Sequence, residues 1–292
     1  MLKTAADAAA AEKVLVAGVG RESVKATIEL AEYAAECRCD AVLVRTPTYY
    51  APLMSKAAVE HYFRSVADRS PLPVLLYNIP KFAPYSMPVE VVAELAQHQN
   101  IIGIKDSTGN VERVRELVLA TQNAPRRMAT VTPIFEPVTA RMMAVRTDSE
   151  SSFVSVAELG GGAALAVKPP AAPMKTRTKD VGFRTLTGSA GTLLESLEAG
   201  AAGAVLAFAA CAPQACQEVY IAWKDHDLGL AAEKQQRITR ASQRVAGDLG
   251  IAGIKYACDF NGYYGGRPRA PLLPLNAEER AEVESLLTQI RN

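Results

Sequence analysis

A repeated pattern of short apolar runs, each followed by a turn and a helical stretch, constrains the fold of this chain more than any other feature. The uniformly apolar runs cover residues 13–19, 41–45, 73–78, 100–105, 183–188 and 203–209. Strands that are apolar on both faces and alternate with helices are typical of a parallel sheet covered on both sides. The pattern therefore predicts the α/β class, with six strands.

Two stretches depart from this pattern. Residues 125–182 are rich in Gly, Ala, Pro and Lys and have no clean period, apart from an expected extended piece at 130–139. Connections this long without regular structure are uncommon inside a domain, so we interpret the segment as an insertion. From residue 213 onward only helical patterns remain. We therefore expect an α/β region over 1–212, with the insertion at about 125–182, and a helical region over 213–292.

The composition excludes several classes of protein. Lys and Arg number 32 against 31 Asp and Glu, a formal charge of +1, which gives no support for binding nucleic acid or a membrane surface through bulk charge. No apolar run approaches the roughly 18 residues of a transmembrane helix, and the first residues lack a signal peptide. The five Cys and three His lack zinc-site spacing. We expect a cytoplasmic protein with reduced thiols and no metal.

Residues at the carboxyl ends of the predicted strands are the candidates for chemistry, because parallel α/β folds place their sites there. Lys105 closes the run IIGI, where burial would favour a neutral amine able to attack a ketone. Tyr77 lies one strand earlier at the equivalent height and could shuttle protons. A lysine that reaches solvent and an ordinary strand-end aromatic are the alternatives. Gly18-Val-Gly20 lacks the third glycine of a dinucleotide-binding fingerprint.

Six strings of residues, in order, resemble one family. They are AGVGRES, TPTYYAP, LLYNIP, IIGIKDSTGN, LTGSAG and GYYGGRPRAPL. Together they resemble the dihydrodipicolinate synthase/N-acetylneuraminate lyase family, whose members are aldolases and synthases on a (β/α)8 TIM barrel. The final strings are most similar to 4-hydroxy-2-oxoglutarate aldolases and fungal 2-keto-3-deoxy-sugar-acid aldolases. The resemblance covers roughly 13–121 and 183–292.

The resemblance implies a role for each matching residue. Lys105 is the lysine that forms a Schiff base with pyruvate or a pyruvate-derived acid, and Tyr77 is the proton-relay tyrosine. Tyr49 matches a tyrosine that members lend across a dimer interface into the neighbour's relay. Gly188, Ser189 and Val205 are expected in the substrate pocket. No cofactor is implied, the substrate is a small 2-oxo acid, and the oligomer is a tetramer built from dimers.

The chain departs from the family in two respects. It starts just before the family's third strand, so the first two strands and their carboxylate-binding Gly-Thr/Ser-x-Gly-Glu motif have no counterpart, and Lys105 and Gly188 are 83 positions apart. We interpret this as an incomplete TIM barrel, which a lost first exon and a translated intron would produce. Any mitochondrial targeting signal would lie in that missing part.

The expected function is cleavage of a 4-hydroxy-2-oxo acid to pyruvate and an aldehyde. Phe82 occupies the position of the second-substrate arginine of dihydrodipicolinate synthases, which argues against that enzyme itself. Three alternatives remain open: a dihydrodipicolinate-synthase-like reaction, a sialic-acid-lyase-like reaction, and a catalytically impaired member that serves as a structural or regulatory subunit.

Overall fold

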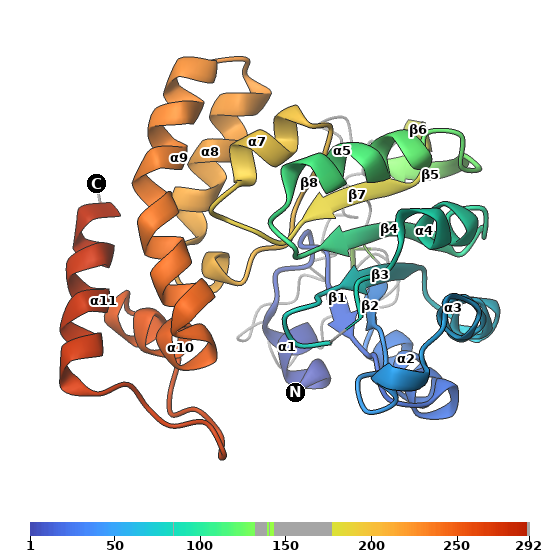
Figure 1. The fold of residues 1–292 in the computed structure, drawn as a ribbon, viewed down its shortest axis with the longest axis horizontal. Coiled ribbons are helices and arrows are strands. Elements are labelled where there is room, and N and C mark those ends of the chain that lie inside the picture. Colours follow the sequence, from blue (N-terminus) through green and yellow to red (C-terminus); the bar gives the residue numbers. More distant parts are fainter. Residues whose placement is uncertain (84, 132–138, 140, 143–176, 291–292) are drawn as a thin grey trace, which may run out of the picture.

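The computed structural model describes residues 1–83, 85–131, 139, 141–142 and 177–290. Its centre is a parallel sheet with the spatial order β1-β2-β3-β4-β7-β8, which curls into a half-barrel (Figure 1). The strands are β1 (Val16–Gly18), β2 (Ala41–Arg45), β3 (Val74–Asn78), β4 (Ile101–Asp106), β7 (Arg184–Thr187) and β8 (Gly203–Ala204). The sheet confirms the predicted α/β class and its six strands, although β8 is much shorter than the apolar run at 203–209.

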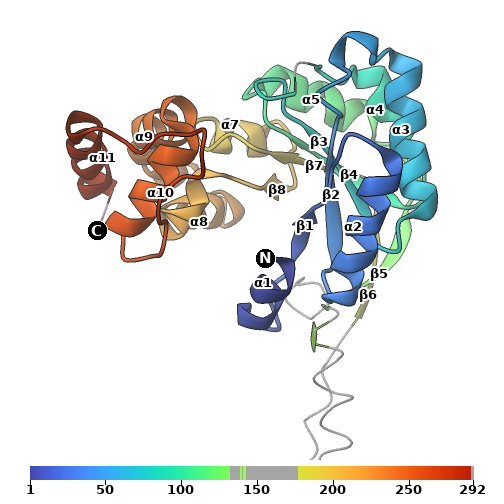
Figure 2. The same ribbon diagram turned by 90° about the horizontal axis from the view of Figure 1, so that it is seen from below.

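Four helices cover the outer face of the sheet: α2 (Val24–Glu36), α3 (Lys56–Arg69), α4 (Val89–Leu95) and α5 (Val111–Ala120) (Figures 1 and 2). Three of them begin at a side chain that accepts a hydrogen bond from a backbone amide three residues on. These caps are Ser23, Ser55 and Asn110, with distances of 3.2, 3.2 and 3.1 Å. Such caps satisfy amides that have no partner within the helix and so fix where it starts.

The described residues contain two large hydrophobic cores. The first lies between the sheet and its outer helices, where Leu76, Ile104 and Phe63 are fully buried. The second lies among the helices of the C-terminal half and includes Phe208 and Ile238. Each core is built from side chains of consecutive elements, so the sheet and the helical half each have apolar packing of their own.

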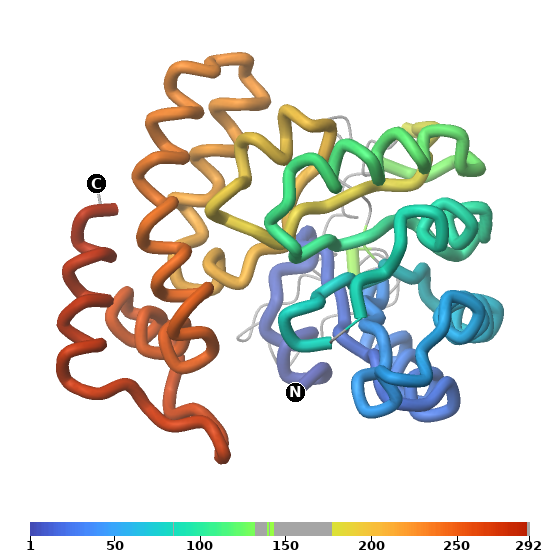
Figure 3. The backbone as a smooth tube through the Cα atoms, viewed as in Figure 1, coloured from blue at the N-terminus to red at the C-terminus, as the bar shows by residue number. Residues whose placement is uncertain are grey.

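The helical half begins at α7 (Leu193–Glu198), which follows β7. After β8 come η3 (Phe208–Ala210), α8 (Pro213–Lys224), α9 (Leu228–Ser242), the π-helical turn η4 (Gln243–Asp248), α10 (Gly250–Phe260) and α11 (Ala277–Ile290). The helices lie to one side of the sheet, with the C-terminus at their outer edge, whereas the N-terminus lies near the sheet (Figures 2 and 3). The chain starts with a short helix, α1 (Leu2–Ala8), which the sequence did not predict.

The ends of the expected insertion have regular structure, which corrects the sequence analysis. β5 (Arg127–Val131) and β6 (Arg177–Val181) pair as a two-stranded antiparallel sheet with Arg127 opposite Val181. These strands are mostly polar and exposed, so they carry no apolar run for a sequence pattern to detect. The expected extended piece at 130–139 lies mostly outside the described residues. Of the helices described, none has the length and apolar character to cross a membrane.

Candidate active site

Lys105 and Tyr77 lie side by side on the inner face of the curled sheet. They are register partners on β4 and β3, and the Nζ atom of Lys105 is 4.2 Å from the centre of the Tyr77 ring. Successive side chains of a strand point to opposite faces, so the preceding residues, Ile104 and Leu76, are buried against the outer helices. Lys105 is only 8% exposed. The two residues that the sequence placed at equal height are therefore in contact.

Asp106, which follows Lys105, is the centre of a buried hydrogen-bond network. Its carboxylate accepts hydrogen bonds from Asn78 Nδ2 at 2.7 Å, the Thr108 amide at 3.0 Å and Arg113 Nε at 2.9 Å. Asn78 Oδ1 in turn accepts from the Met87 amide at 2.9 Å. The side chain of Asp106 is fully buried, and a buried charge needs such partners. The network ties the ends of β3 and β4 together and so fixes the strands that carry the lysine and the tyrosine.

Gly188, at the end of β7, lies directly against Lys105. Its amide donates to the carbonyl of Asp106 at 2.7 Å. A Cβ at this position would lie 1.9 Å from Ser107 Oγ, 2.9 Å from Ser107 Cβ and 3.1 Å from Lys105 Cε. Only glycine fits, because any side chain here would displace Ser107 and the lysine.

A cavity of about 520 Å³ adjoins Lys105 and Tyr77. Much of its wall consists of hydroxyl and amide side chains, among them Ser107, Thr108, Ser189, Thr239, Ser242 and Gln243. Among the described residues that line it there is no Asp or Glu, and the one charged side chain besides Lys105 is Lys81. The cavity therefore adjoins the Lys105 amine, and the rest of its wall carries little charge and combines hydroxyl and amide groups with apolar side chains.

The three positions expected to bind substrate differ in where they lie. Gly188 and Ser189 line the cavity. Val205 follows β8, where its amide donates to the carbonyl of Thr187 at 2.9 Å, and it is not among the lining residues. Ala207 and Phe208 line the cavity in that region instead.

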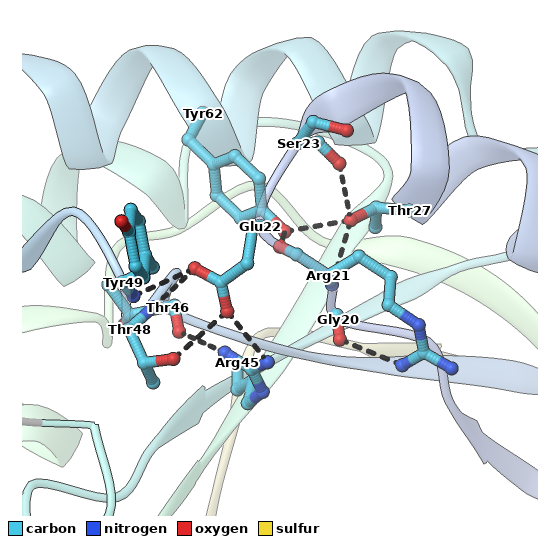
Figure 4. Close-up of polar contacts among 10 residues, drawn as sticks. All are labelled: Gly20, Arg21, Glu22, Ser23, Thr27, Arg45, Thr46, Thr48, Tyr49 and Tyr62. Carbon is cyan, nitrogen blue, oxygen red and sulfur yellow. Dashed lines mark hydrogen bonds and ion pairs between the residues drawn. The ribbon is translucent and has the colours of Figure 1, made fainter.

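A second polar cluster lies at the carboxyl ends of β1 and β2 and is centred on Glu22 (Figure 4). One carboxylate oxygen accepts from the Thr48 and Tyr49 amides at 2.8 and 2.9 Å. The other accepts from Thr48 Oγ1 at 2.9 Å and Arg45 Nη2 at 3.0 Å. Burial opposes ionisation of the carboxyl, but the hydrogen bonds from Tyr49, Arg45 and Thr48 outweigh it and lower the pKa of Glu22 from 4.5 to about 2.

The backbone on the other side of Glu22 is also held in place. Tyr62 Oη donates to the carbonyl of Arg21 at 3.0 Å, and the Arg21 amide donates to Thr27 Oγ1 at 3.0 Å. Tyr62 lies 5% exposed, and burial raises the pKa of its phenol. A Cβ on Gly20 would lie 2.7 Å from the amide nitrogen of Arg45, so glycine is needed where β1 ends against β2.

Tyr49 points away from the site of its own chain. Its side chain is 81% exposed and meets the ring of Tyr50 edge-on, with the ring centres 5.2 Å apart. It is not among the residues that line the cavity. The structure of one chain therefore brings Lys105 and Tyr77 together and leaves Tyr49 outside.

Sequence reasoning missed the residues that hold the site in place: Glu22, Arg45, Asn78, Asp106 and Arg113. Asp106 is adjacent to Lys105, but the sequence did not indicate that Arg113, on α5, returns to it. Three other partners lie 23 to 28 positions away from the carboxylates that they contact. One signal in the sequence could have indicated two of them: Arg45 and Asp106 are charged residues at the ends of apolar runs.

The described residues contain no group of three or more His, Cys, Asp or Glu side chains placed to hold a metal ion. All five cysteines are free, and four of them are buried. Burial raises the pKa of Cys211 and of Cys216 to about 12.

A comparison with known protein families identifies the family of the chain. The model of the dihydrodipicolinate synthetase family matches residues 1–128 and 170–290. The chain belongs to this family. Among its relatives, the L-threo-3-deoxy-hexylosonate aldolase of Hypocrea jecorina is 29% identical, covering 99% of this chain and 75% of that one. The 4-hydroxy-tetrahydrodipicolinate synthase of Gluconacetobacter diazotrophicus is 26% identical, covering 94% and 72%.

Solved structures support the same fold. A prophage protein of the dihydrodipicolinic acid synthase family from E. coli K12, solved in complex with pyruvate, superposes with a TM-score of 0.73 at 24% identity. The match covers 99% of this chain and 79% of that one. Dihydrodipicolinate synthase of Thermotoga maritima gives 0.74 at 16% identity, with the same coverage. The half-barrel thus matches part of the fold of these relatives, over about three quarters of their length.

Proposed function

We propose that this family member is a Schiff-base aldolase that cleaves a 4-hydroxy-2-oxo acid to pyruvate and an aldehyde. The observation that carries the proposal is the buried amine of Lys105 against the phenol of Tyr77, at one end of a cavity. A lysine shielded from water beside a proton-transferring group is the arrangement that imine chemistry needs.

The proposed reaction starts with addition of the neutral Lys105 amine to the C2 carbonyl of the substrate. Loss of water gives a protonated imine. The C4 hydroxyl then loses its proton, the C3–C4 bond breaks, and its electron pair moves into the imine to give an enamine and a free aldehyde. Protonation of the enamine at C3 and hydrolysis of the imine release pyruvate and restore the amine. Tyr77, in contact with the lysine, is suited to carry the protons.

We propose that Tyr49 acts in the active site of a second copy of the chain. Its exposed ring cannot assist Tyr77 of its own chain without leaving the place where its backbone is held. In a dimer that joins the carboxyl ends of the two β2 strands, the Tyr49 phenol of each chain would reach Tyr77 of the other chain. The proposed active unit is therefore a homo-oligomer with shared sites.

The chemistry of the cavity wall indicates which class of substrate fits. Its hydroxyl and amide groups suit the aldehyde half of a sugar acid, which is neutral and rich in hydroxyls, better than a second carboxylate. Phe82 lines the cavity. By the family resemblance, dihydrodipicolinate synthases carry the arginine that binds their second substrate at this position. The name of the Hypocrea jecorina relative, a 3-deoxy-hexylosonate aldolase, agrees with this choice. We propose a 2-keto-3-deoxy sugar acid as the substrate.

Pyruvate release, coupled to lactate dehydrogenase, tests the proposal. We expect a 2-keto-3-deoxy-hexonate to be cleaved with a kcat/KM at least about tenfold above that of 4-hydroxy-2-oxoglutarate, a difference of about 1.4 kcal/mol in transition-state binding. Equal or reversed preference would contradict the assignment of the substrate. Absence of pyruvate from both compounds would contradict the aldolase itself.

A further inference from the structure

The Glu22 cluster has no place in the reaction as proposed, yet it holds the backbone of Tyr49. We propose that Glu22 is a positioning residue for catalysis, which sets the direction of the Tyr49 phenol toward the relay of a second copy. The inference rests on the proposed function, because it gives Glu22 a role only if Tyr49 has one.

The geometry fixes two consecutive peptide units. A single oxygen of Glu22 accepts from the amides of Thr48 and Tyr49 at 2.8 and 2.9 Å, so both amides must point to one place. The other oxygen holds the Thr48 hydroxyl and Arg45. With both carboxylate oxygens engaged, the backbone at residues 48 and 49 has little freedom to rotate.

Glu22 is itself attached to rigid elements. Arg45, the last residue of β2, also donates through Nη1 to the carbonyl of Thr46 at 2.9 Å. Arg21 is held by Tyr62 and Thr27, from α3 and α2. The position of the carboxylate is therefore set by the sheet and two helices, and the hydrogen bonds transfer that position to the Tyr49 backbone (Figure 4).

Tyr49 depends on this backbone restraint because nothing else in the described chain fixes its ring. At 81% exposed, the ring has one described aromatic neighbour, Tyr50, which is itself 48% exposed. Tyr77, by contrast, is held by strand pairing on both sides. The direction of the Tyr49 side chain in the free chain thus follows from the two amides bound to Glu22.

Glu22 holds the backbone amides of Thr48 and Tyr49 and takes no part in proton transfer. Its carboxyl lies among Arg45, the hydroxyl of Thr48 and two amides, all donors. These partners lower its pKa to about 2, so it stays ionised wherever the enzyme would work. Replacing it with glutamine keeps the shape but weakens acceptance by one of the two oxygens, because the amide nitrogen cannot accept.

The test uses pyruvate alone, in D2O, and follows exchange of its methyl protons by proton NMR. Exchange needs the Lys105 imine and a proton relay but no aldehyde. We expect Tyr49→Phe to slow exchange about 100-fold and Glu22→Gln about tenfold, with the pyruvate KM and the fraction of Lys105 trapped by borohydride unchanged. The double variant Glu22→Gln/Tyr49→Phe is expected to be no more than about twofold slower than Tyr49→Phe.

Glu29→Gln is the matched control, since Glu29 is exposed on α2 with only a 3.8 Å ion pair to Lys25. Should Glu22→Gln not fold, Thr48→Val removes one donor to the carboxylate and is expected to slow exchange about threefold through the same route. Equal exchange in Glu22→Gln and the parent chain, independent effects in the double variant, or a parallel fall in trapping and exchange would overturn the inference. A parent chain that pyruvate does not trap would overturn the proposed function, and this inference with it.

Discussion

Two carboxylates at the carboxyl-end side of the sheet organise the candidate site in different ways. Asp106 is fully buried and joins β3 to β4, so that Lys105 and Tyr77 are fixed within one chain. Glu22 is partly exposed and fixes a loop whose tyrosine ring points outward. Under the proposed function, the imine half of the site would be complete in a single chain, whereas the relay half would require a second copy.

Mixing two inactive variants gives the largest expected effect. Lys105→Met and Tyr49→Phe each leave about 1% or less of the pyruvate exchange rate, because one removes the amine and the other the lent phenol. Co-expressed with different tags, they are expected to recover about a quarter of the parent rate, since half of the randomly paired dimers are mixed and each has one intact site.

The control for this mixing is the pair Lys105→Met and Tyr77→Phe. Both residues belong to the same chain's site, so no mixed dimer contains an intact site, and we expect no recovery beyond the rate of Tyr77→Phe alone. Recovery absent from the Tyr49 mixture would place Tyr49 outside the shared site and remove the contrast between the two carboxylates.

Removing the buried carboxylate is the next largest effect. In Asp106→Ala the guanidinium of Arg113, only 13% exposed, loses its partner, and the free energy of unfolding is expected to fall by about 3–5 kcal/mol. Asp180→Ala is the matched control: it breaks the exposed pair with Arg126 and should cost about 0–1 kcal/mol. Urea unfolding measures both. Similar losses in the two variants would show that the Asp106 network does not stabilise this end of the sheet.

Gly188→Ala tests how closely β7 packs on the lysine. The added methyl would meet Ser107 and Lys105, and we expect a loss of about 1–3 kcal/mol in stability together with weaker trapping of pyruvate. Gly203→Ala is the control, because its Cβ has its nearest contact at 3.7 Å. A harmless Gly188→Ala would mean that Ser107 and Lys105 can move apart at little cost.

The smallest effect concerns pH. The pKa of Glu22 is about 2 in the folded chain against an ordinary 4.5. A lowered carboxyl pKa stabilises the fold above about pH 4.5, and this contribution is lost as the pH falls toward 2. With its side chain 36% exposed, solvent screening limits the contribution to about 1 kcal/mol. The unfolding free energies of the parent chain and Glu22→Gln, measured by urea at about pH 6 and pH 3, should differ less at the lower pH.

The sequence predicted the half of the site that lies on apolar strands. Lys105 and Tyr77 end two uniformly apolar runs, and parallel pairing of those runs places the two side chains in register without further information. The resemblance to the family added roles for them, and the family match confirms that resemblance. The positions of the strands were therefore accessible from local pattern alone.

The rest depends on contacts between segments that no local pattern connects. Glu22 meets Thr48 and Tyr49 only because β1 and β2 pair and their loops turn toward each other. The β5–β6 pair consists mostly of polar residues, and its pairing rests on backbone hydrogen bonds and an ion pair between Arg126 and Asp180 more than on apolar burial. The length of β8, two residues where the apolar run covers 203–209, was likewise not accessible, because its pairing with β7 decides where the strand ends.

The most direct test of the central claim is reductive trapping of pyruvate on the chain, read by peptide mass spectrometry. The account predicts one borohydride-stable adduct, on Lys105, formed by the parent chain and by Tyr49→Phe but absent from Lys105→Met. An adduct on another lysine, or none on soluble and folded protein, would contradict the claim that this half-barrel holds a complete imine-forming site.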